Sequence, residues 1–458
     1  MPETSTHHRD EAFEEQPTAG SADETRLDKL GIPHVLRWGF LGVLIFMTGN
    51  GIESNFVSPH IADAFGGGDS KIDLAAKIIM FYSAAVLIGS YLAGALSDLY
   101  GPRRIMTLGV VVWVVFEMAF LGSLQLHSEL LTSLSYALRG FGFPLFAFSF
   151  LVWINHVVDQ RRNAAAVGWF YVMFTGGLPT LGSLVAVFMI PAFGGGYGGQ
   201  AWTMFASTAV VLIGFLVARF GVHERHGTMR MAPSEETRAA VILSGLKLTF
   251  TNHRIALGFL TRLINTAPEF GMFIILPTVI ADQLGWGMSR WLLMTTVVYA
   301  GNILFNAAFG ALGDRFGWTQ TVRWFGILGS ALGLLAWWYI PHLVPAGSSW
   351  GFVVSVAAGT TFGILLAGFV PLGAILPAIA PRHKGAAMAM YTTAAGGATF
   401  LGSLVVAVVR PFLGNVGVVW TFVLLYAAAF AMTFFFKVHQ PRLHGPAADE
   451  AEEAAATA

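Results

Sequence analysis

The chain contains no cysteine among its 458 residues. It therefore cannot form a disulfide, bind a metal through thiolates or use a thiol nucleophile. Charged residues are also scarce, at 11% of the sequence against about 25% in a typical soluble domain. The 26 basic and 26 acidic side chains cancel, so the composition indicates no nucleic-acid or other anionic partner. These absences exclude thiol chemistry and argue against a soluble domain.

Long apolar runs take the place of the missing charge, since 55% of the residues are hydrophobic. A run of roughly 20 apolar residues crosses a bilayer as a helix. We predict an all-α membrane protein with about twelve transmembrane helices. The 53 glycines suit the close helix packing found in lipid. The predicted spans are residues 36–64, 73–99, 103–124, 128–158, 164–190, 200–220, 254–282, 288–312, 320–341, 349–380, 384–410 and 415–437.

Polar segments divide the chain. Residues 221–253 are predicted to be a cytoplasmic linker between an N-terminal half, 36–220, and a C-terminal half, 254–438. Residues 1–35 and 439–458 are predicted to be disordered tails. The first tail lacks the basic region and apolar core of a signal peptide. Lys and Arg concentrate in both tails and in every second loop, so we expect both termini to be cytoplasmic.

A short hinge sequence occurs twice. Residues 94–104 read GALSDLYGPRR, and residues 310–317 read GALGDRFG, 216 positions later, each at the end of an apolar run. The segment LGSLV at 181–185 also returns unchanged at 401–405. Matches at nearly constant offset predict two similar halves, which is how many transporters are built.

The hinge resembles the Gly-x-x-x-Asp-x-x-Gly-x-Arg-Arg signature of the major facilitator superfamily, and the resemblance covers residues from about 35 to 440. Within that superfamily the chain is similar to the ribitol and D-arabinitol permeases. The resemblance implies two six-helix halves related by a pseudo-two-fold axis, and proton-coupled uptake of a small linear sugar alcohol by alternating access. The segments that carry the narrower similarity are FMTGNGIE (46–53), LRGFGFPLF (138–146), RLINT (262–266), VRWFG (322–326) and HKGAAMAMY (383–391).

Charged residues inside apolar runs are costly unless they are paired or wetted, so each is a functional candidate. Glu53 and Arg139 are predicted to form the proton-coupling pair. A carboxylate beside a cation changes its proton affinity when a cavity opens or closes around it. The alternative is a permanent ion pair that only joins two helices. Glu117 has no evident partner in the sequence, and we expect it either to be protonated or to lie near the outer surface, with its role left open.

A polyol offers only hydroxyl groups, which amides and carboxylates bind through hydrogen bonds while aromatic faces cover the carbon backbone. Two helix faces carry suitable side chains at i, i+3 and i+7 spacing, one starting at Arg262 and one at Tyr299. The alternatives are a clamp that fixes one helix and hydrogen bonds that join neighbouring helices. The predicted substrate-binding residues are Asn50, Trp169, Arg262, Asn265, Glu269, Tyr299, Asn302, Asn306 and Tyr391.

The two hinges are predicted to be gating elements, because an Asp and an Arg across a short loop can pair in one conformation and separate in another. The alternative is a role in topology alone. The second hinge lacks the Arg pair, since Trp318 and Thr319 follow its last glycine, and we expect it to be the weaker gate. The predicted gating residues are Gly94, Asp98, Gly101, Arg103, Arg104, Gly310, Asp314, Arg315 and Gly317.

Two other transport functions stay open. Arg139 and Arg262 could bind a carboxylate such as 2-oxoglutarate by bidentate hydrogen bonds, although Glu53 and Glu269 oppose an anion. The segment GGLPTLG at 176–182 imperfectly resembles a motif of drug/proton antiporters and would indicate an exporter. No metal-ligand cluster or phosphate-binding loop indicates an enzyme. We therefore predict no catalytic residue and no cofactor, and we expect a monomer.

Overall fold

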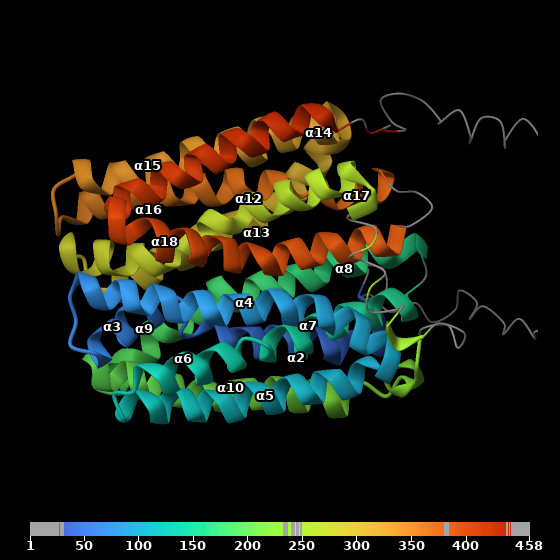
Figure 1. Cartoon of the computed structure of the whole chain (residues 1–458), viewed down its shortest axis with the longest axis horizontal. Helices are drawn as coiled ribbons and strands as arrows, with labels where there is room; N and C mark the ends of the chain where they lie inside the picture. Colours follow the sequence, from blue (N-terminus) through green and yellow to red (C-terminus); the bar gives the residue numbers. More distant parts are fainter. Residues whose placement is uncertain are drawn as a thin grey trace, which may run out of the picture.

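The computed structural model describes residues 32–158, 160–231, 250–379 and 384–436, with isolated residues at 27, 237–239, 243, 247, 438 and 440. Every regular element in these residues is a helix. The predicted tails lie almost entirely outside the described residues. Figure 1 shows the first half of the chain, coloured blue to green, packed beside the second half, coloured yellow to red, with the long helices of both running along the same direction.

The helices of the first half follow the predicted spans in order. α6 begins after Ser128, whose hydroxyl accepts a hydrogen bond from the Leu131 amide and caps the helix. The elements are η1 (His34–Leu36), α2 (Arg37–Gly51), α3 (Val57–Ala64), α4 (Asp69–Tyr100), α5 (Pro102–Gln125), α6 (Glu129–Arg139), α7 (Gly142–Val157), α8 (Gln160–Thr175), η2 (Gly176–Leu181), α9 (Gly182–Ala192), α10 (Gly196–Gly221) and η3 (Arg225–Thr228).

The second half begins at α12, which Asn252 caps through its side-chain oxygen. Its elements are α12 (His253–Pro277), η4 (Thr278–Gln283), α13 (Met288–Phe316), α14 (Trp318–Thr321), η5 (Val322–Gly329), α15 (Ser330–Leu343), α16 (Ser349–Leu366), η6 (Ala367–Phe369), α17 (Leu372–Ile379), α18 (Lys384–Met432) and η8 (Thr433–Phe435).

Ten helices of the described residues are long and apolar enough to cross a membrane. Two local features account for the difference from the twelve predicted spans. The first predicted span is interrupted by a turn at 52–56, so α2 and α3 are each too short to be counted. The last two predicted spans are joined in α18, where Gly414 leaves the helical conformation at φ 63° and ψ −170°.

The repeated LGSLV segment makes the same kind of contact in each half. In the first half, Gly182 packs directly on the backbone of Gly51 in the first span. In the second half, Gly402 packs on the backbone carbonyl of Ala267 in α12. In both places a side chain on the glycine would collide with the neighbouring backbone, so only glycine allows the approach. The sequence repeat therefore corresponds to a repeated helix–helix contact.

Helices from different halves meet along two seams. α4 packs along α18, and α13 packs along η2 and α9. Ser83 on α4 and Ser403 on α18 are joined by a hydrogen bond of 2.9 Å. At the end remote from the segment that joins α10 to α12, Trp291 Nε1 donates to the Asn55 carbonyl at 2.7 Å. A cavity lies between these seams.

Candidate functional site

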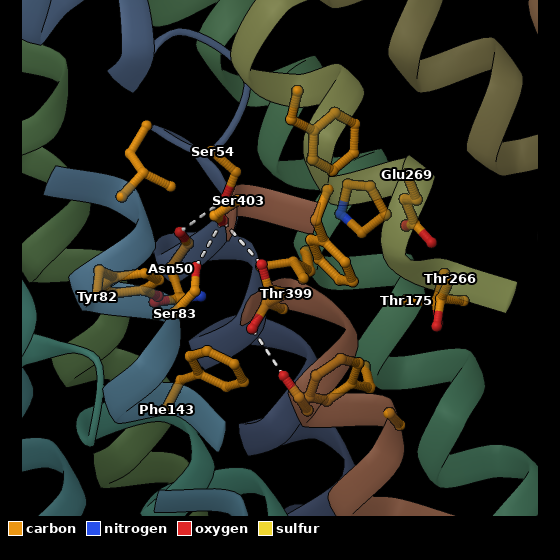
Figure 2. Close-up of a pocket in the computed structure, with 18 of the residues that line it drawn as sticks. Asn50, Ser54, Tyr82, Ser83, Phe143, Thr175, Thr266, Glu269, Thr399 and Ser403 are labelled. Carbon is orange, nitrogen blue, oxygen red and sulfur yellow. Dashed lines mark hydrogen bonds between the residues drawn. The ribbon is translucent and has the colours of Figure 1, made fainter. Parts of the chain in front are cut away.

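The cavity is lined by residues from both halves. The first half contributes parts of α2, α3, α4, α6, α7, α8 and η2, and the second half contributes parts of α12, α13, α16, η6 and α18. Figure 2 shows Asn50, Tyr82 and Ser83 on one side, and Glu269 and Thr266 on the opposite side. A ligand in this cavity would therefore contact both halves at once.

Breaks in two helices place charged groups near the cavity. Glu53 lies in the turn that separates α2 from α3, two residues after Gly51. Arg139 is the last residue of α6, and Gly140 and Phe141 separate it from α7. Gly140 is needed at this break because a side chain there would collide with the Tyr82 carbonyl of α4. Discontinuous helices are a common means of building binding sites at membrane depth.

Glu53 and Arg139 form a buried ion pair. Arg139 NH1 donates to Glu53 Oε1, and the Tyr136 hydroxyl donates to the same oxygen at 3.3 Å. Arg139 also contacts a second carboxylate, because its Nε lies 2.6 Å from Glu117 Oε2 on α5. None of the three charged side chains is more than 2% exposed. One cation thus faces two carboxylates.

Aromatic rings surround this cluster. The Arg139 guanidinium lies 4.4 Å from the centre of the Trp113 ring, and the Tyr136 and Tyr82 rings lie 5.4 Å and 5.7 Å away. Trp113 Nε1 donates to Asn50 Oδ1 at 2.7 Å, which links the cluster to the cavity wall. Cation–π contacts of this kind stabilise a cation that has lost its water.

The second half presents Arg262 and Glu269 to the cavity from α12. Arg262 NH1 donates to the Thr266 hydroxyl at 2.8 Å, and its guanidinium lies 4.1 Å from the centre of the Phe369 ring and 5.1 Å from that of Tyr391. Glu269 forms no hydrogen bond or ion pair with the other described residues. The cavity wall of this half therefore holds an immobilised cation and an unengaged carboxylate.

The other predicted substrate-binding residues differ in position. Asn302 and Asn306 line the cavity from α13, although Asn302 Nδ2 also donates to the Gly363 carbonyl at 2.8 Å. Asn265 points into the second half, where its Nδ2 donates to the Gly326 carbonyl. Asn265, Trp169, Tyr299 and Tyr391 are not among the residues that line the cavity. The structure thus brings Asn50, Arg262, Glu269, Asn302 and Asn306 to one space.

The first hinge contacts the segment that follows α10. The Asp98 carbonyl accepts a hydrogen bond of 2.8 Å from the Met231 amide, and the Asp98 carboxylate lies 3.7 Å from His156 Nε2. Arg103 NH2 donates to the Val222 carbonyl. Gly101 has a φ of 87° and lies against Thr228, where a side chain would collide with the backbone.

The second hinge makes fewer contacts. Gly317 ends α13 with a φ of 105°, like its counterpart in the first hinge. Gly94 has open space around it, and the nearest atom to a side chain on Gly310 would be Val370 Cγ1 at 3.8 Å. Arg104 and Arg315 are exposed. The side chain of Asp314 lies outside the described residues.

The contact of Glu117 with Arg139 is the feature of the site that sequence reasoning missed. Nothing in the sequence pairs Glu117 with Arg139, because the two residues lie on separate helices with no spacing rule between them. The available signal was that Glu117 is the one carboxylate in the apolar run 103–124, where an isolated charge is costly. No group of three or more metal-ligating side chains occurs within the described parts of the chain.

Comparison with known proteins identifies the family. The chain matches the model of the Major Facilitator Superfamily over residues 39–369 and 258–458. It is 35% identical over 420 residues to the D-arabinitol transporter of Klebsiella pneumoniae, covering 90% of this chain and 94% of that protein. It is 32% identical over 416 residues to the ribitol transporter of Klebsiella pneumoniae, covering 90% and 94%.

A relative with a different named substrate is equally similar. The chain is 35% identical over 415 residues to the alpha-ketoglutarate permease of Bacillus subtilis (strain 168), covering 90% of this chain and 92% of that protein. Among solved structures, the crystal structure of the D-xylose-proton symporter is similar at a TM-score of 0.68 and 16% identity, covering 89% of this chain and 98% of that one. This likeness shows the fold alone. The chain therefore belongs to the major facilitator superfamily and is a multi-pass membrane transporter rather than an enzyme.

Proposed function

We propose that the chain takes up a small linear sugar alcohol together with protons. The observation that carries this proposal is the charge of the cavity wall. The charged residues among those that line the cavity are Glu53, Glu269 and Arg262, two carboxylates and one cation. Arg139 is paired with carboxylates and does not line the cavity. Glu269 offsets Arg262, so the wall offers no net positive charge to attract an anion even when Glu53 is protonated, whereas an uncharged polyol needs none.

The uncharged part of the wall also suits a polyol. Asn50, Asn302, Asn306 and Thr399 offer amide and hydroxyl groups for hydrogen bonds to hydroxyls. Phenylalanine rings cover the remaining surface and suit the C–H side of a carbon chain. The relatives named as D-arabinitol and ribitol transporters support the same substrate class. The lining phenylalanines are Phe143, Phe148, Phe174, Phe270, Phe273 and Phe369.

In this proposal Glu53 carries the coupling proton and substrate binds between the halves. Protonation of Glu53 weakens its ion pair with Arg139, and the halves 36–220 and 254–438 then rock against each other around the occupied cavity. The two hinges act as gates on the side of the linker. The protein works as a monomer in a bacterial inner membrane, with both termini in the cytoplasm.

A second candidate substrate is a 2-oxo acid. Arg262 faces the cavity with a fixed guanidinium, and such a group binds carboxylates by two parallel hydrogen bonds. The relative named alpha-ketoglutarate permease supports this alternative. The polyol is favoured because a dicarboxylate needs a second cation, and Arg139 is already engaged by two carboxylates.

The test is to record external pH in weakly buffered cells that express the protein while ribitol, D-arabinitol, xylitol, mannitol or 2-oxoglutarate is added. We expect alkalinisation with one of the polyols and its loss in the Glu53→Gln variant. Glu129→Gln is the matched control, because Glu129 is an exposed carboxylate that pairs with Lys71 at 3.3 Å. Polyol uptake without a pH change would contradict proton coupling. Alkalinisation with 2-oxoglutarate alone would contradict the polyol.

A further inference from the structure

Two carboxylates share the Arg139 guanidinium and approach it at different nitrogen atoms. Arg139 NH1 donates to Glu53 Oε1, and Glu117 Oε2 lies 2.6 Å from Arg139 Nε. The second oxygen of Glu53 has no hydrogen-bond partner among the described residues. The two acids therefore depend on one cation for their neutralisation.

The charge balance indicates that one of the two carboxyl groups carries a proton. With both carboxylates ionised, the cluster has a net charge of −1 and almost no exposure to water. An unpaired buried ion costs several kcal/mol. One proton makes the cluster neutral, whereas a simple pair of Glu53 and Arg139 would be neutral with no proton at all. Glu117 thus changes how many protons the closed cluster holds.

The cavity distinguishes the two carboxyl groups. Glu53 lines the cavity, and its Oε2 has no hydrogen-bond partner among the described residues. Glu117 and Arg139 are not among the lining residues. A proton that arrives through the cavity therefore reaches Glu53 first, while Glu117 remains beside the Arg139 Nε.

We propose that Glu117 is a positioning residue of the proton site. It stays ionised and neutralises Arg139, so that Glu53 can hold a proton in the closed cluster and release it when the cavity is wetted. The cluster exchanges one proton in each cycle. The use of this proton to drive uptake rests on the proposed function, whereas the presence of the proton in the cluster does not.

Other titratable groups near α5 do not substitute for Glu117. Tyr82 on α4 faces Arg139 through its ring, and Tyr136 on α6 does so too while its hydroxyl donates to Glu53 Oε1. On α3, His60 faces away toward α10, where its Nδ1 contacts Gln200 Oε1 at 3.0 Å. On α7, His156 lies at the hinge beside Asp98. Glu117 is therefore the second acid of the site among the described residues.

The test is carbodiimide labelling of the purified, membrane-reconstituted protein without substrate, followed by mass spectrometry of the modified peptides. Carbodiimides react with protonated carboxyl groups in apolar surroundings. We expect labelling of Glu53 at neutral pH in the natural protein and about a tenfold or larger decrease in Glu117→Gln, with labelling regained at acidic pH. Glu117→Asp keeps the second acid and should keep the labelling. Glu269 lines the same cavity and is the internal reference, because its labelling should be the same in the natural protein and in both Glu117 variants.

Labelling of Glu53 that is unchanged in Glu117→Gln would overturn the proposal, as would labelling of Glu117 in place of Glu53. If Glu117→Gln does not fold, the labelling of Glu53 in the natural protein still tests the proposal. If Arg139 paired with Glu53 alone, Glu53 would be ionised and would not be labelled at neutral pH. If Glu117 neutralises Arg139, Glu53 is protonated and is labelled.

Transport separates this proposal from the proposed function. If Glu53 is labelled in a Glu117-dependent way but no polyol alkalinises the medium, the one-proton cluster stands and the polyol–proton symport fails. If both hold, Glu117→Gln should exchange substrate across the membrane yet accumulate it only at acidic external pH. Accumulation at neutral pH in that variant would contradict the role of Glu117.

Discussion

Glu269 is the least restrained charged group in the cavity. It projects from α12 on the side opposite Asn50, as Figure 2 shows, and it makes no hydrogen bond with the described residues. Its neighbour Arg262 is held by Thr266 and by the Phe369 ring. A free carboxylate at the wall is a strong acceptor for vicinal hydroxyls. We therefore expect Glu269 to act in substrate recognition and not in helix packing.

Replacing Glu269 by Gln should weaken polyol binding and leave the protein folded. A hydrogen bond to a charged group contributes about 1.5–3 kcal/mol, which corresponds to roughly a ten- to hundredfold rise in KM. Initial rates of labelled polyol uptake at several concentrations measure this change, and Glu129→Gln again serves as the exposed control. An unchanged KM for the polyol would contradict the assigned role.

For individual residues, the sequence indicates which side chains are unusual but not which of them contact one another. Charges in apolar runs identify Glu53, Glu117, Arg139, Arg262 and Glu269 as candidates, because each is costly in lipid. Helix periodicity relates residues of one helix, and only the family resemblance connects Glu53 with Arg139. The contact of Glu117 with Arg139 depends on how α5 packs against α6, which no local pattern encodes.

The break between α2 and α3 is the element that brings Glu53 to the cavity. Gly51 ends α2 directly against η2, and a side chain at this position would overlap the Leu178 carbonyl. η2 is itself irregular, because Pro179 interrupts the regular hydrogen bonds of the helix. Two irregular segments thus pack on each other, and the close approach requires glycine.

Gly51→Ala should therefore destabilise the protein, because the added methyl group forces two backbones apart. Overpacking of this kind typically costs about 1–3 kcal/mol. Gly122→Ala is the matched control on α5, since Gly122 has open space around it and alanine is the better helix former. Thermal unfolding in detergent should show a lower Tm for Gly51→Ala alone. Equal Tm values for the two variants would contradict the tight contact between α2 and η2.

The helices themselves could be predicted well, and their interruptions could not. The predicted spans 73–99 and 103–124 correspond to α4 and α5 within a few residues, because apolar length determines where a chain crosses a bilayer. The turn at 52–56 lies inside the predicted span 36–64. Gly49-Asn50-Gly51 indicated only that the helix could bend there, since the direction of the bend depends on its contact with η2.

The two halves are similar in construction and different in chemistry. The hinge and the LGSLV segment recur, and Glu53 has Glu269 as its counterpart 216 positions later. The same offset leads from Glu117 to Gly333 and from Arg139 to Ser355, so the shared-cation cluster has no copy in the second half. We infer that the first half binds the coupling proton and that the second half contributes more to substrate selectivity.

The halves are also joined by charge, at the end remote from the linker. Arg410 on α18 reaches across to α4, where its NH2 lies 2.9 Å from Asp69 Oδ1 and its NH1 donates to Asp73 Oδ1. The Arg410 side chain is only 7% exposed, and Asn415 Oδ1 accepts from its Nε at 2.8 Å. An alternating-access cycle must break this contact each time the cavity opens on that side.

Arg410→Gln should therefore shift the protein toward opening at that end. Ion pairs with one exposed partner contribute up to about 1 kcal/mol, which corresponds to roughly a fivefold larger open population. Because the chain has no cysteine, a single Ser54→Cys in the cavity wall reports this opening without background. Its rate of modification by a membrane-impermeant thiol reagent, added from the side remote from the linker, should rise by about the same factor.

The matched control for this experiment is Arg290→Gln. Arg290 lies near the start of α13, at the same end of the molecule, but its guanidinium packs on Phe352 within its own half. Arg290→Gln should leave the modification rate of Ser54→Cys unchanged, because Arg290 has no ion pair with the first half among the described residues. Equal acceleration by both substitutions would mean that loss of surface charge, and not the bond between α18 and α4, controls access. Restoration of the slow rate by exchanging the charges, Arg410→Asp with Asp73→Arg, would assign the effect to the ion pair itself.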